Sequence, residues 1–306
     1  MKKILTIVVL LLSATYGFAD ESLEDKLANL AEEGGKDYLR PLVTAFGTDL
    51  NSGWLFSAKA TKPLRFGITL SGIASFVPGE DKSFFMENPN TTIYEGVQTE
   101  TATIFGEKGG FFAPKPELES TVDTLWLPDG VDFDIAPIIT PQIFIGLPKG
   151  FELSARGLPP IKIDDDIGDL SFWGIGLKHE ITTWMPLLPI DISLQGAYQS
   201  LKVGDVVTAH TTFLNAAVSK KLLSFTFYGG VGLESTTANV EYKYTYYKVD
   251  EGGATPVEKQ IKFDLDGENE FRFFAGIRYH FLAFDLCADY SYGNYSVLRL
   301  GLGASF

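Results

Sequence analysis

Apolar residues occupy every second position along most of the chain after residue 63. Between Leu64 and Val77, apolar side chains alternate with Arg65, Gly67, Thr69, Ser71 and Ser75, and Ile73 is the exception on the polar side. Such alternation is typical of strands with one apolar and one polar face. It recurs at 138–147, 151–158, 170–183, 190–201, 207–219, 223–240, from about 261, and at 271–281, 284–292 and 298–306. The pattern predicts an all-β protein.

Periodicity alone does not say which face of these strands is buried, and a soluble β-sandwich alternates as well. Two features favour an apolar face turned outward into lipid. Many runs reach ten residues or more, as membrane strands require, whereas ordinary strands average about 5–6. Short turns at 148–150, 220–221 and near Leu282 contrast with long polar loops such as 241–260, and outer-membrane barrels show this asymmetry.

The last strand ends on Phe306 and resembles the C-terminal targeting signal of bacterial outer-membrane β-barrels. The assembly signal is carried by Leu298, Leu300, Leu302 and Phe306, and it implies the barrel-assembly machinery as a partner. We therefore predict a transmembrane, up-and-down antiparallel β-barrel of about 12 strands, with 10 or 14 as alternatives, since such barrels have even strand numbers. Trp173 and Trp184 are eleven residues apart and are either the two aromatic girdles of this barrel or, for Trp184, a packed turn residue.

The chain begins with the features of a secretory signal peptide. Lys2 and Lys3 precede an apolar run from Ile4 to Leu12 and a small-residue end at Gly17-Phe18-Ala19, which predicts cleavage near Ala19. The predicted organisation is a signal peptide at 1–19, a helical plug or cap segment at 20–62 and an outer-membrane barrel at 63–306. The expected location is the outer membrane of a Gram-negative bacterium.

Residues 20–62 have apolar positions at helical spacing, with a break at Gly34-Gly35. Proline is tolerated near a helix start and glycine suits a helix end, so Pro41 and Gly47 predict two short helices. Their apolar face must be buried, which favours a lumen plug or a periplasmic cap over a free tether. The run 54–60 is assigned to this segment, because counting it as a strand would make the total odd. Residues 78–136 are mixed and could hold a hairpin near 91–105 and 121–127.

Composition removes several other classes of protein. The formal net charge is -14, so a nucleic-acid partner is not expected, since phosphate binding needs clustered Lys and Arg. No run after the start approaches the ~18–20 apolar residues of a membrane helix. Cys287 is the single cysteine and cannot form an internal disulfide; by parity it faces the lumen.

By parity, the predicted lumen carries charges of both signs and a few aromatic rings. The lumen-facing candidates are Arg65, Glu152, Arg156, Lys178, Glu180, Asp191, Arg272, Arg278, Asp285, Asp289 and Arg299, with an apolar lumen patch of Phe144, Phe172, Phe213 and Phe274. The charges form either a structural ion-pair lattice that fills the barrel or a conduit selective by charge. The apolar patch would suit a small hydrophobic ligand.

No catalytic, cofactor or metal site is expected. Outer-membrane proteases and phospholipases need a His with carboxylate or Ser partners. By parity His179 falls on the lipid face, while His280 lies near a periplasmic turn and His210 near the outer rim. His210 beside one of Asp164, Asp165 or Asp166 would be the one Asp-His pair. The acidic runs 164–166 and 264–268 could bind Ca²⁺, but we expect solvated turns, or divalent cations shared with lipopolysaccharide.

Three stretches resemble an uncharacterised outer-membrane β-barrel family common in Bacteroidetes-type bacteria, and the likeness covers nearly all of the mature chain. They are FGTDLNSGWLFSAK at 46–59, APIITPQIFIGLP at 136–148 and WGIGLKH at 173–179. More distantly, a helical hatch before a barrel looks like the long-chain fatty-acid transporter group, which implies passage of hydrophobic molecules past the hatch.

The predicted function is a porin-like channel or transporter for small, hydrophobic solutes, which diffuse passively past the N-terminal plug. The alternative is a structural or surface-interaction barrel with a closed lumen and extracellular loops that bind a partner. In either case outer-membrane lipid and lipopolysaccharide are the expected surroundings.

Overall fold

The computed structural model describes residues 23–164, 168–185, 187–250 and 253–306. The proposed signal peptide, with its cleavage position at Ala19, lies outside these residues. Among the described residues, no helix has the length and hydropathy needed to span a bilayer.

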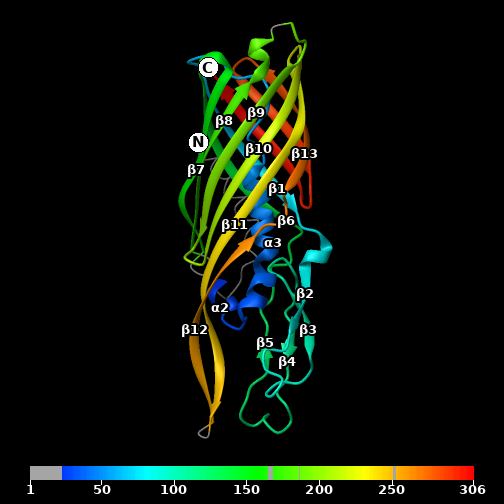
Figure 1. Cartoon of the computed structure of the whole chain (residues 1–306), viewed down its shortest axis with the longest axis vertical. Helices are drawn as coiled ribbons and strands as arrows, with labels where there is room; N and C mark the ends of the chain where they lie inside the picture. Colours follow the sequence, from blue (N-terminus) through cyan, green and yellow to red (C-terminus); the bar gives the residue numbers. More distant parts are fainter. Residues whose placement is uncertain (1–22, 165–167, 186, 251–252) are drawn as a thin grey trace.

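Ten strands of the described chain close into an antiparallel barrel (Figure 1). They are β1 (Phe66–Phe76), β6 (Ile135–Gly146), β7 (Phe151–Asp164), β8 (Gly168–Glu180), β9 (Asp191–Val203), β10 (Val207–Leu222), β11 (Phe225–Asp250), β13 (Phe271–Phe281), β14 (Phe284–Tyr292) and β15 (Ser296–Ser305). The pairing of β10 with β11 joins the two ends of this sheet, and the pairing of β1 with β15 joins its first and last strands in the sequence. The all-β antiparallel barrel is confirmed, and its strand number is the smaller alternative of ten rather than twelve.

The two ends of the barrel differ. One end, which we call the short-turn end, carries the 3₁₀ turns η3 (Pro148–Gly150) and η4 (Ile181–Trp184) and the C-terminal Phe306. The opposite, long-hairpin end carries an extension of β11 paired with β12 (Gly253–Asp266), which is not a barrel strand. The expectation of a polar loop at 241–260 was wrong, because these residues continue the alternation and pair as a hairpin.

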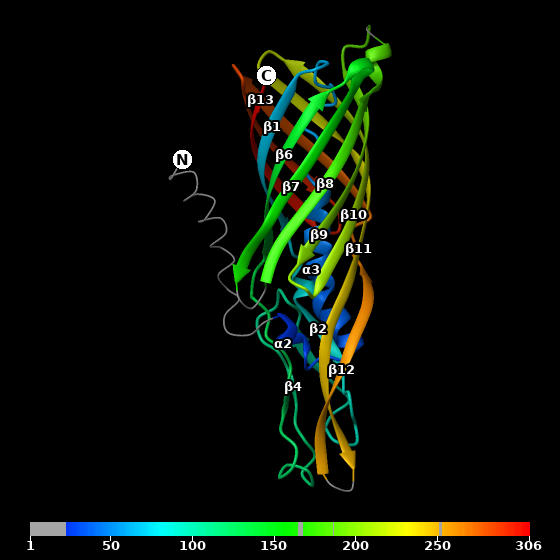
Figure 2. The same cartoon turned by 90° about the vertical axis from the view of Figure 1, so that its left-hand side faces the viewer.

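Residues 78–134 add no strand to the barrel. They form η2 (Gly79–Lys82), the pair β2 (Ser83–Glu87) and β3 (Gln98–Ala102), and the pair β4 (Phe111–Phe112) and β5 (Leu125–Trp126). Strands of two to five residues are too short to cross a bilayer, which takes about 9–11. In place of the hairpin expected near 91–105 and 121–127, the chain forms two short strand pairs beyond the barrel (Figure 2).

The N-terminal segment contains α2 (Leu23–Leu27) and one long helix, α3 (Glu32–Asn51). The expected break at Gly34-Gly35 was wrong, because α3 runs through both glycines and through Pro41. A Cβ at Gly35 would collide with the Tyr242 hydroxyl of β11, so glycine lets the helix lie close to that strand. The run 54–60 forms no strand.

Apolar side chains cover the outside of the barrel. Leu298, Leu300, Leu302 and Phe306 are exposed, as are Trp173 in the middle of β8 and Trp184 at the end of η4. Trp184 is therefore not packed into its turn. Buried apolar residues gather instead between α3, the long-hairpin end and the inner faces of the strands.

Candidate functional site

The barrel interior is occupied by the N-terminal segment. α3 enters from the long-hairpin end, and the chain continues beyond its last turn to the short-turn end, where β1 begins (Figures 1 and 2). Residues 48–61, which we call the lumen segment, meet inward-facing polar side chains of the wall along this course. The candidate site is this segment with the side chains that hold it.

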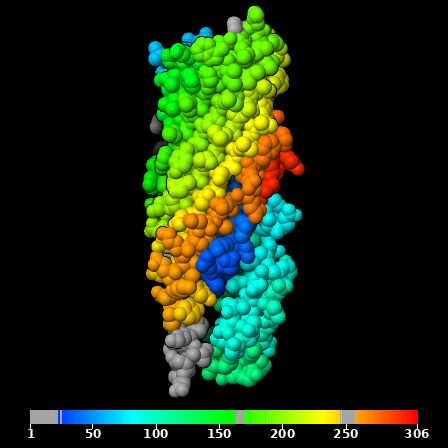
Figure 3. All heavy atoms as spheres, in the orientation of Figure 1, coloured from blue at the N-terminus to red at the C-terminus, as the bar shows by residue number. Residues whose placement is uncertain are grey.

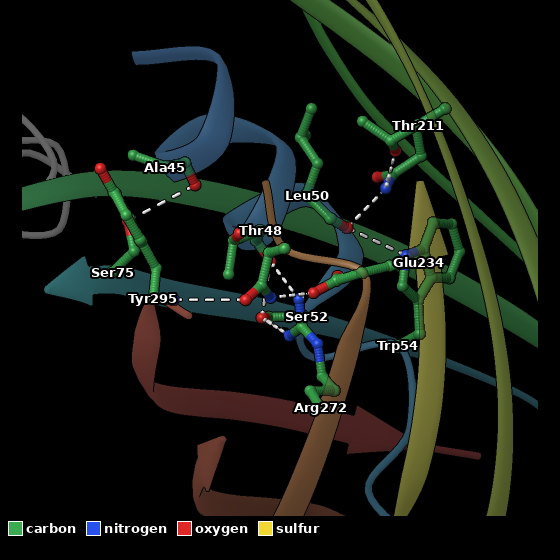
Figure 4. Close-up of polar contacts among 12 residues, drawn as sticks. Ala45, Thr48, Leu50, Ser52, Trp54, Ser75, Thr211, Glu234, Arg272 and Tyr295 are labelled. Carbon is green, nitrogen blue, oxygen red and sulfur yellow. Dashed lines mark hydrogen bonds and ion pairs between the residues drawn. The ribbon is translucent and has the colours of Figure 1, made fainter. Parts of the chain in front are cut away.

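Arg272 on β13 holds the last turn of α3. Its guanidinium donates to the Thr48 carbonyl at 2.8 Å and to the Ser52 hydroxyl, and it pairs with Glu234 on β11 (Figure 4). Arg272 is only 1% exposed. A helix leaves its last four carbonyls without intrahelical partners and has a negative dipole end there. A cation at this position therefore satisfies both the carbonyl and the dipole.

Arg156 on β7 completes the same helix end. It donates to the carbonyls of Leu50 at 3.2 Å and Ser52 at 2.8 Å, and its Nε donates to Gln142 at 2.7 Å. The guanidinium carbon also lies 4.0 Å from the centre of the Trp54 ring, close enough for a cation–π interaction. One wall residue thus fixes the backbone and the first aromatic side chain after α3.

Arg299 on β15 binds the next stretch of the lumen segment. It donates to the Leu55 carbonyl at 3.0 Å, pairs with Asp289 at 3.2 Å and contacts the Cys287 sulfur at 2.7 Å. Asp289 in turn accepts from the Tyr228 hydroxyl at 2.7 Å. Arg299 has no exposed surface, so its charge is balanced entirely inside the barrel.

Lys178 on β8 and two carboxylates hold the end of the lumen segment. Lys178 pairs with Glu152 at 2.8 Å and donates to the Ser57 carbonyl at 3.1 Å. The backbone N–H groups of Thr61 and Ala60 donate to Glu152 and Glu180, each at 2.8 Å. Cations of the wall thus bind backbone carbonyls of this segment, and carboxylates of the wall bind its N–H groups.

The remaining charged candidates lie at the short-turn end. Asp285 accepts from Arg278 at 2.7 and 2.8 Å and contacts His280 at 2.7 Å, and Asp191 lies 3.8 Å from Lys59. Arg65 is exposed at the rim. Arg65, Asp191 and Arg278 line a pocket of about 280 Å³ together with Phe56 and Phe144. The space beside Arg272 and Asp289 is only about 20 Å³.

The four phenylalanines do not form one patch. Phe144 packs on Phe56 with ring centres 5.2 Å apart, and Phe213 lies under Arg272 at 5.4 Å. Phe172 joins the large apolar core near the long-hairpin end, and Phe274 is partly buried against a smaller cluster. Three of them therefore pack around the lumen segment, and Phe172 stands apart in an apolar region.

Sequence reasoning missed Glu234, Gln195 and Gln199, which face the lumen and bind Arg272 or the carbonyls of Trp54 and Leu50. Each shares the parity of buried neighbours on its strand, so alternation could have found them. It also missed Asp49, which is fully buried on α3 beside Ser75. No period-two rule reaches a helical residue.

The structure places His280 beside Asp285 and the other two histidines away from carboxylates of the described side chains. His179 points outward and stacks on Phe151 with ring centres 4.2 Å apart, and His210 is exposed beside the Tyr198 hydroxyl at 3.0 Å. Asp165 and Asp166 lie outside the described residues, as does the Asp164 side chain. Asp264 and Asp266 accept from Asn239 and Thr237 at 2.9 and 2.8 Å. Within the described ranges, no three His, Cys, Asp or Glu side chains form a metal-binding group.

A model of a family of unknown function, DUF6588, matches residues 1–306. The chain belongs to this family. No curated protein matches it. The Bacteroidetes origin and the link to fatty-acid transporters stay predictions, because neither is part of what the family description states.

Several solved structures are similar to this DUF6588 chain. The outer membrane protease OmpT from Escherichia coli is 10% identical, with a TM-score of 0.33, over 82% of this chain and 100% of that one. The translocator domain of the autotransporter NalP from Neisseria meningitidis is 11% identical, with a TM-score of 0.29, over 86% and 92%. The N-terminal β-barrel domain of Pseudomonas aeruginosa OprF is 19% identical, with a TM-score of 0.25, over 51% and 96%.

Proposed function

We propose that this protein is an outer-membrane β-barrel with a closed lumen, which presents its long-hairpin end at the cell surface as a module that binds a partner. The observation that carries the proposal is the lumen segment, bound by four buried cations from β7, β8, β13 and β15. A solute would have to displace all of these contacts. The apolar outer face of the strands supports placement in lipid.

Orientation follows from the two ends. In outer-membrane barrels the short turns face the periplasm and the longer connections face outward. The long-hairpin module, which comprises α2, the first half of α3, β2–β5 and the β11–β12 extension, then lies outside the cell. Figure 3 shows the start of α3 between β12 and the segment that contains β2.

The long-hairpin module offers a surface for a partner. Phe111 and Trp126, opposite each other on β4 and β5, are 51% and 64% exposed with ring centres 5.1 Å apart. Exposed aromatic residues are enriched among those that contribute most to protein–protein binding. Just before β2, Lys82 pairs with Asp134 and with Asp132 at 3.6 Å, and the hydrogen bond that its ammonium donates to Asp134 raises the pKa of Lys82.

Single-channel recording in a planar bilayer distinguishes the closed lumen proposed here from the channel predicted from the sequence. We expect the full-length mature protein to give no stepwise conductance, because the lumen segment fills the pore. A variant that lacks residues 23–61 is the positive control, and we expect it to conduct. Stepwise conductance of the full-length protein would overturn the closed lumen and favour transport.

A further inference from the structure

The barrel wall is interrupted between β6 and β7. Their pairing stops at Gln142↔Arg156. On the far sides, β6 stays paired with β1 up to Ile135 and β7 stays paired with β8 up to Asp164. In the described structure no ladder pair joins residues 135–141 of β6 to residues 157–164 of β7, and we call this break the seam.

Prolines account for the place where the seam begins. The Gly146 N–H donates to the Arg65 carbonyl, so even-numbered residues of β6 bond toward β1 and odd-numbered ones, Pro137 and Pro141 included, face β7. Proline has no N–H to donate and occurs on unpaired strand edges. The ladder ends at Pro141, the first proline that it meets from the short-turn end.

The facing edge of β7 carries a proline as well. The Leu147 N–H donates to the Phe151 carbonyl, which turns the odd-numbered residues of β7, Pro159 included, toward β6. A continued register would place Pro141 opposite Gly157 and Ile139 opposite Pro159. Neither pair could form a full set of backbone hydrogen bonds, so the sequence itself keeps the seam unpaired.

The seam lies within the depth expected for lipid. Five paired residues separate it from the short-turn end, about 13 Å at ~3.3 Å per residue and a tilt of ~40°, against an apolar band of about 25 Å. Outside, a groove of about 680 Å³ meets it at Pro141 and Gly157. The groove is bordered by the outward side chains Ile68, Leu70, Ile143, Phe284 and Leu302.

The inner side of the seam is mostly apolar, with the buried Thr140 of β6 as its polar exception. Ile138 of β6 and Phe172 of β8 are buried in the large core cluster with Leu42 of α3, and Leu158 of β7 packs against this cluster opposite Phe172. The polar contacts of the lumen segment lie nearer the short-turn end. The seam thus lies between an apolar outer groove and the apolar half of the interior.

We propose that the seam admits the acyl chain of a membrane amphiphile, with its tail among Ile138, Leu158 and Phe172 and its polar end at the unpaired backbone groups. Unpaired N–H and C=O groups in contact with hydrocarbon alone are strongly unfavourable, so a ligand with a polar end and an apolar tail fits both surfaces. This inference rests on the proposed placement in a membrane but not on the closed lumen.

Photo-crosslinking tests the proposal. The full-length mature protein is refolded into vesicles that contain phosphatidylcholine with a diazirine at the end of one acyl chain, and adducts are mapped by mass spectrometry. We expect adducts at the inward-facing Ile138 and Leu158 as well as at the outward-facing Ile143. A parallel arm with diazirine-bearing palmitic acid shows whether a free acid enters more readily than a phospholipid chain.

Two independent variants close the seam. Pro141→Val with Pro159→Val restores the missing N–H donors, and Gly157→Leu fills the groove where a side chain has room. Each should lose most of the adducts at Ile138 and Leu158 and keep those at Ile143, whereas Pro189→Val, in an exposed turn, should keep all of them.

The outcomes separate the seam from the membrane placement. Adducts confined to outward residues in the unmodified protein, or inward adducts that persist in both folded seam variants, would overturn the acyl-chain route. A lack of adducts at Ile143 itself would instead contradict the placement of the barrel in lipid.

Discussion

Arg272 shows how one residue links three parts of the molecule. Its guanidinium joins β13, Glu234 of β11 and the last turn of α3. Because both charges are buried, removal of either leaves the other without an opposite charge in a medium of low dielectric constant. Removal of one partner should therefore lower the free energy of unfolding by more than the intact pair contributes to it.

Arg272→Met should lower the free energy of unfolding by about 3–5 kcal/mol, because Glu234 keeps its charge without the guanidinium. Urea unfolding of the refolded barrel in lipid vesicles, followed by tryptophan fluorescence, measures this loss. Lys262→Met is the control: its pair with Glu241 spans 3.3 Å between exposed side chains, and such pairs contribute about 0–1 kcal/mol. Equal losses in both variants would contradict the role assigned to Arg272.

For Asp49 we expect the opposite effect of a substitution on the free energy of unfolding. Its carboxyl group is fully buried beside Ser75, while Arg272 already pairs with Glu234. Asp49→Asn keeps the shape and removes the charge, so the free energy of unfolding should stay unchanged or rise by about 1–3 kcal/mol. The same urea titration decides, and a loss as large as that of Arg272→Met would refute the interpretation.

At the scale of elements, the sequence predicts some features of this fold and not others. Alternation separates Arg299, which is buried, from Leu300, which is exposed, because neighbouring positions of a strand face opposite sides whatever the rest of the fold does. It does not give the strand number, because residues 241–266 alternate like barrel strands and yet extend beyond the barrel. Pairing partners far apart in sequence decide that outcome.

The contacts of the N-terminal segment could not be predicted from the sequence either, because they too depend on partners far apart in the chain. Its helical spacing indicates an apolar face, but the partners of its backbone, such as Arg156 and Arg299, come from strands more than one hundred residues away. The prediction of two helices failed at Gly34-Gly35 because glycine in a helix is unfavourable by about 1 kcal/mol, and the close contact with Tyr242 offsets that cost.

The fit of α3 against β11 gives a test at this scale. A Cβ at Gly47 would collide with the Thr236 side chain, so Gly47→Leu should push the helix away from the wall and lower the free energy of unfolding by about 1–3 kcal/mol or more. Gly72→Leu is the matched control, since Gly72 is exposed on β1 and has no atom within 4 Å of its Cβ position. Similar losses would show that the helix contact is not tight.

For the whole molecule, the proposed orientation predicts which end is reached from outside the cell. Lys259→Cys, exposed on β12, should react with a membrane-impermeant maleimide on intact cells, whereas Lys149→Cys, exposed in η3, should react only after lysis. Mass spectrometry of the isolated protein measures both, and the native Cys287 is buried. Reaction of Lys149→Cys alone on intact cells would reverse the orientation.

The course of α3 has a topological consequence. Leu23 and β12 belong to the same end of the molecule, whereas β1 starts at the opposite end, so the chain is threaded through its own ring before the ring begins. Given the proposed orientation, a peptide fused ahead of Leu23 would be displayed on the cell surface and would not remain in the periplasm. The ring must also close, by pairing of β1 with β15, around a thread already in place, or the thread must be drawn through afterwards.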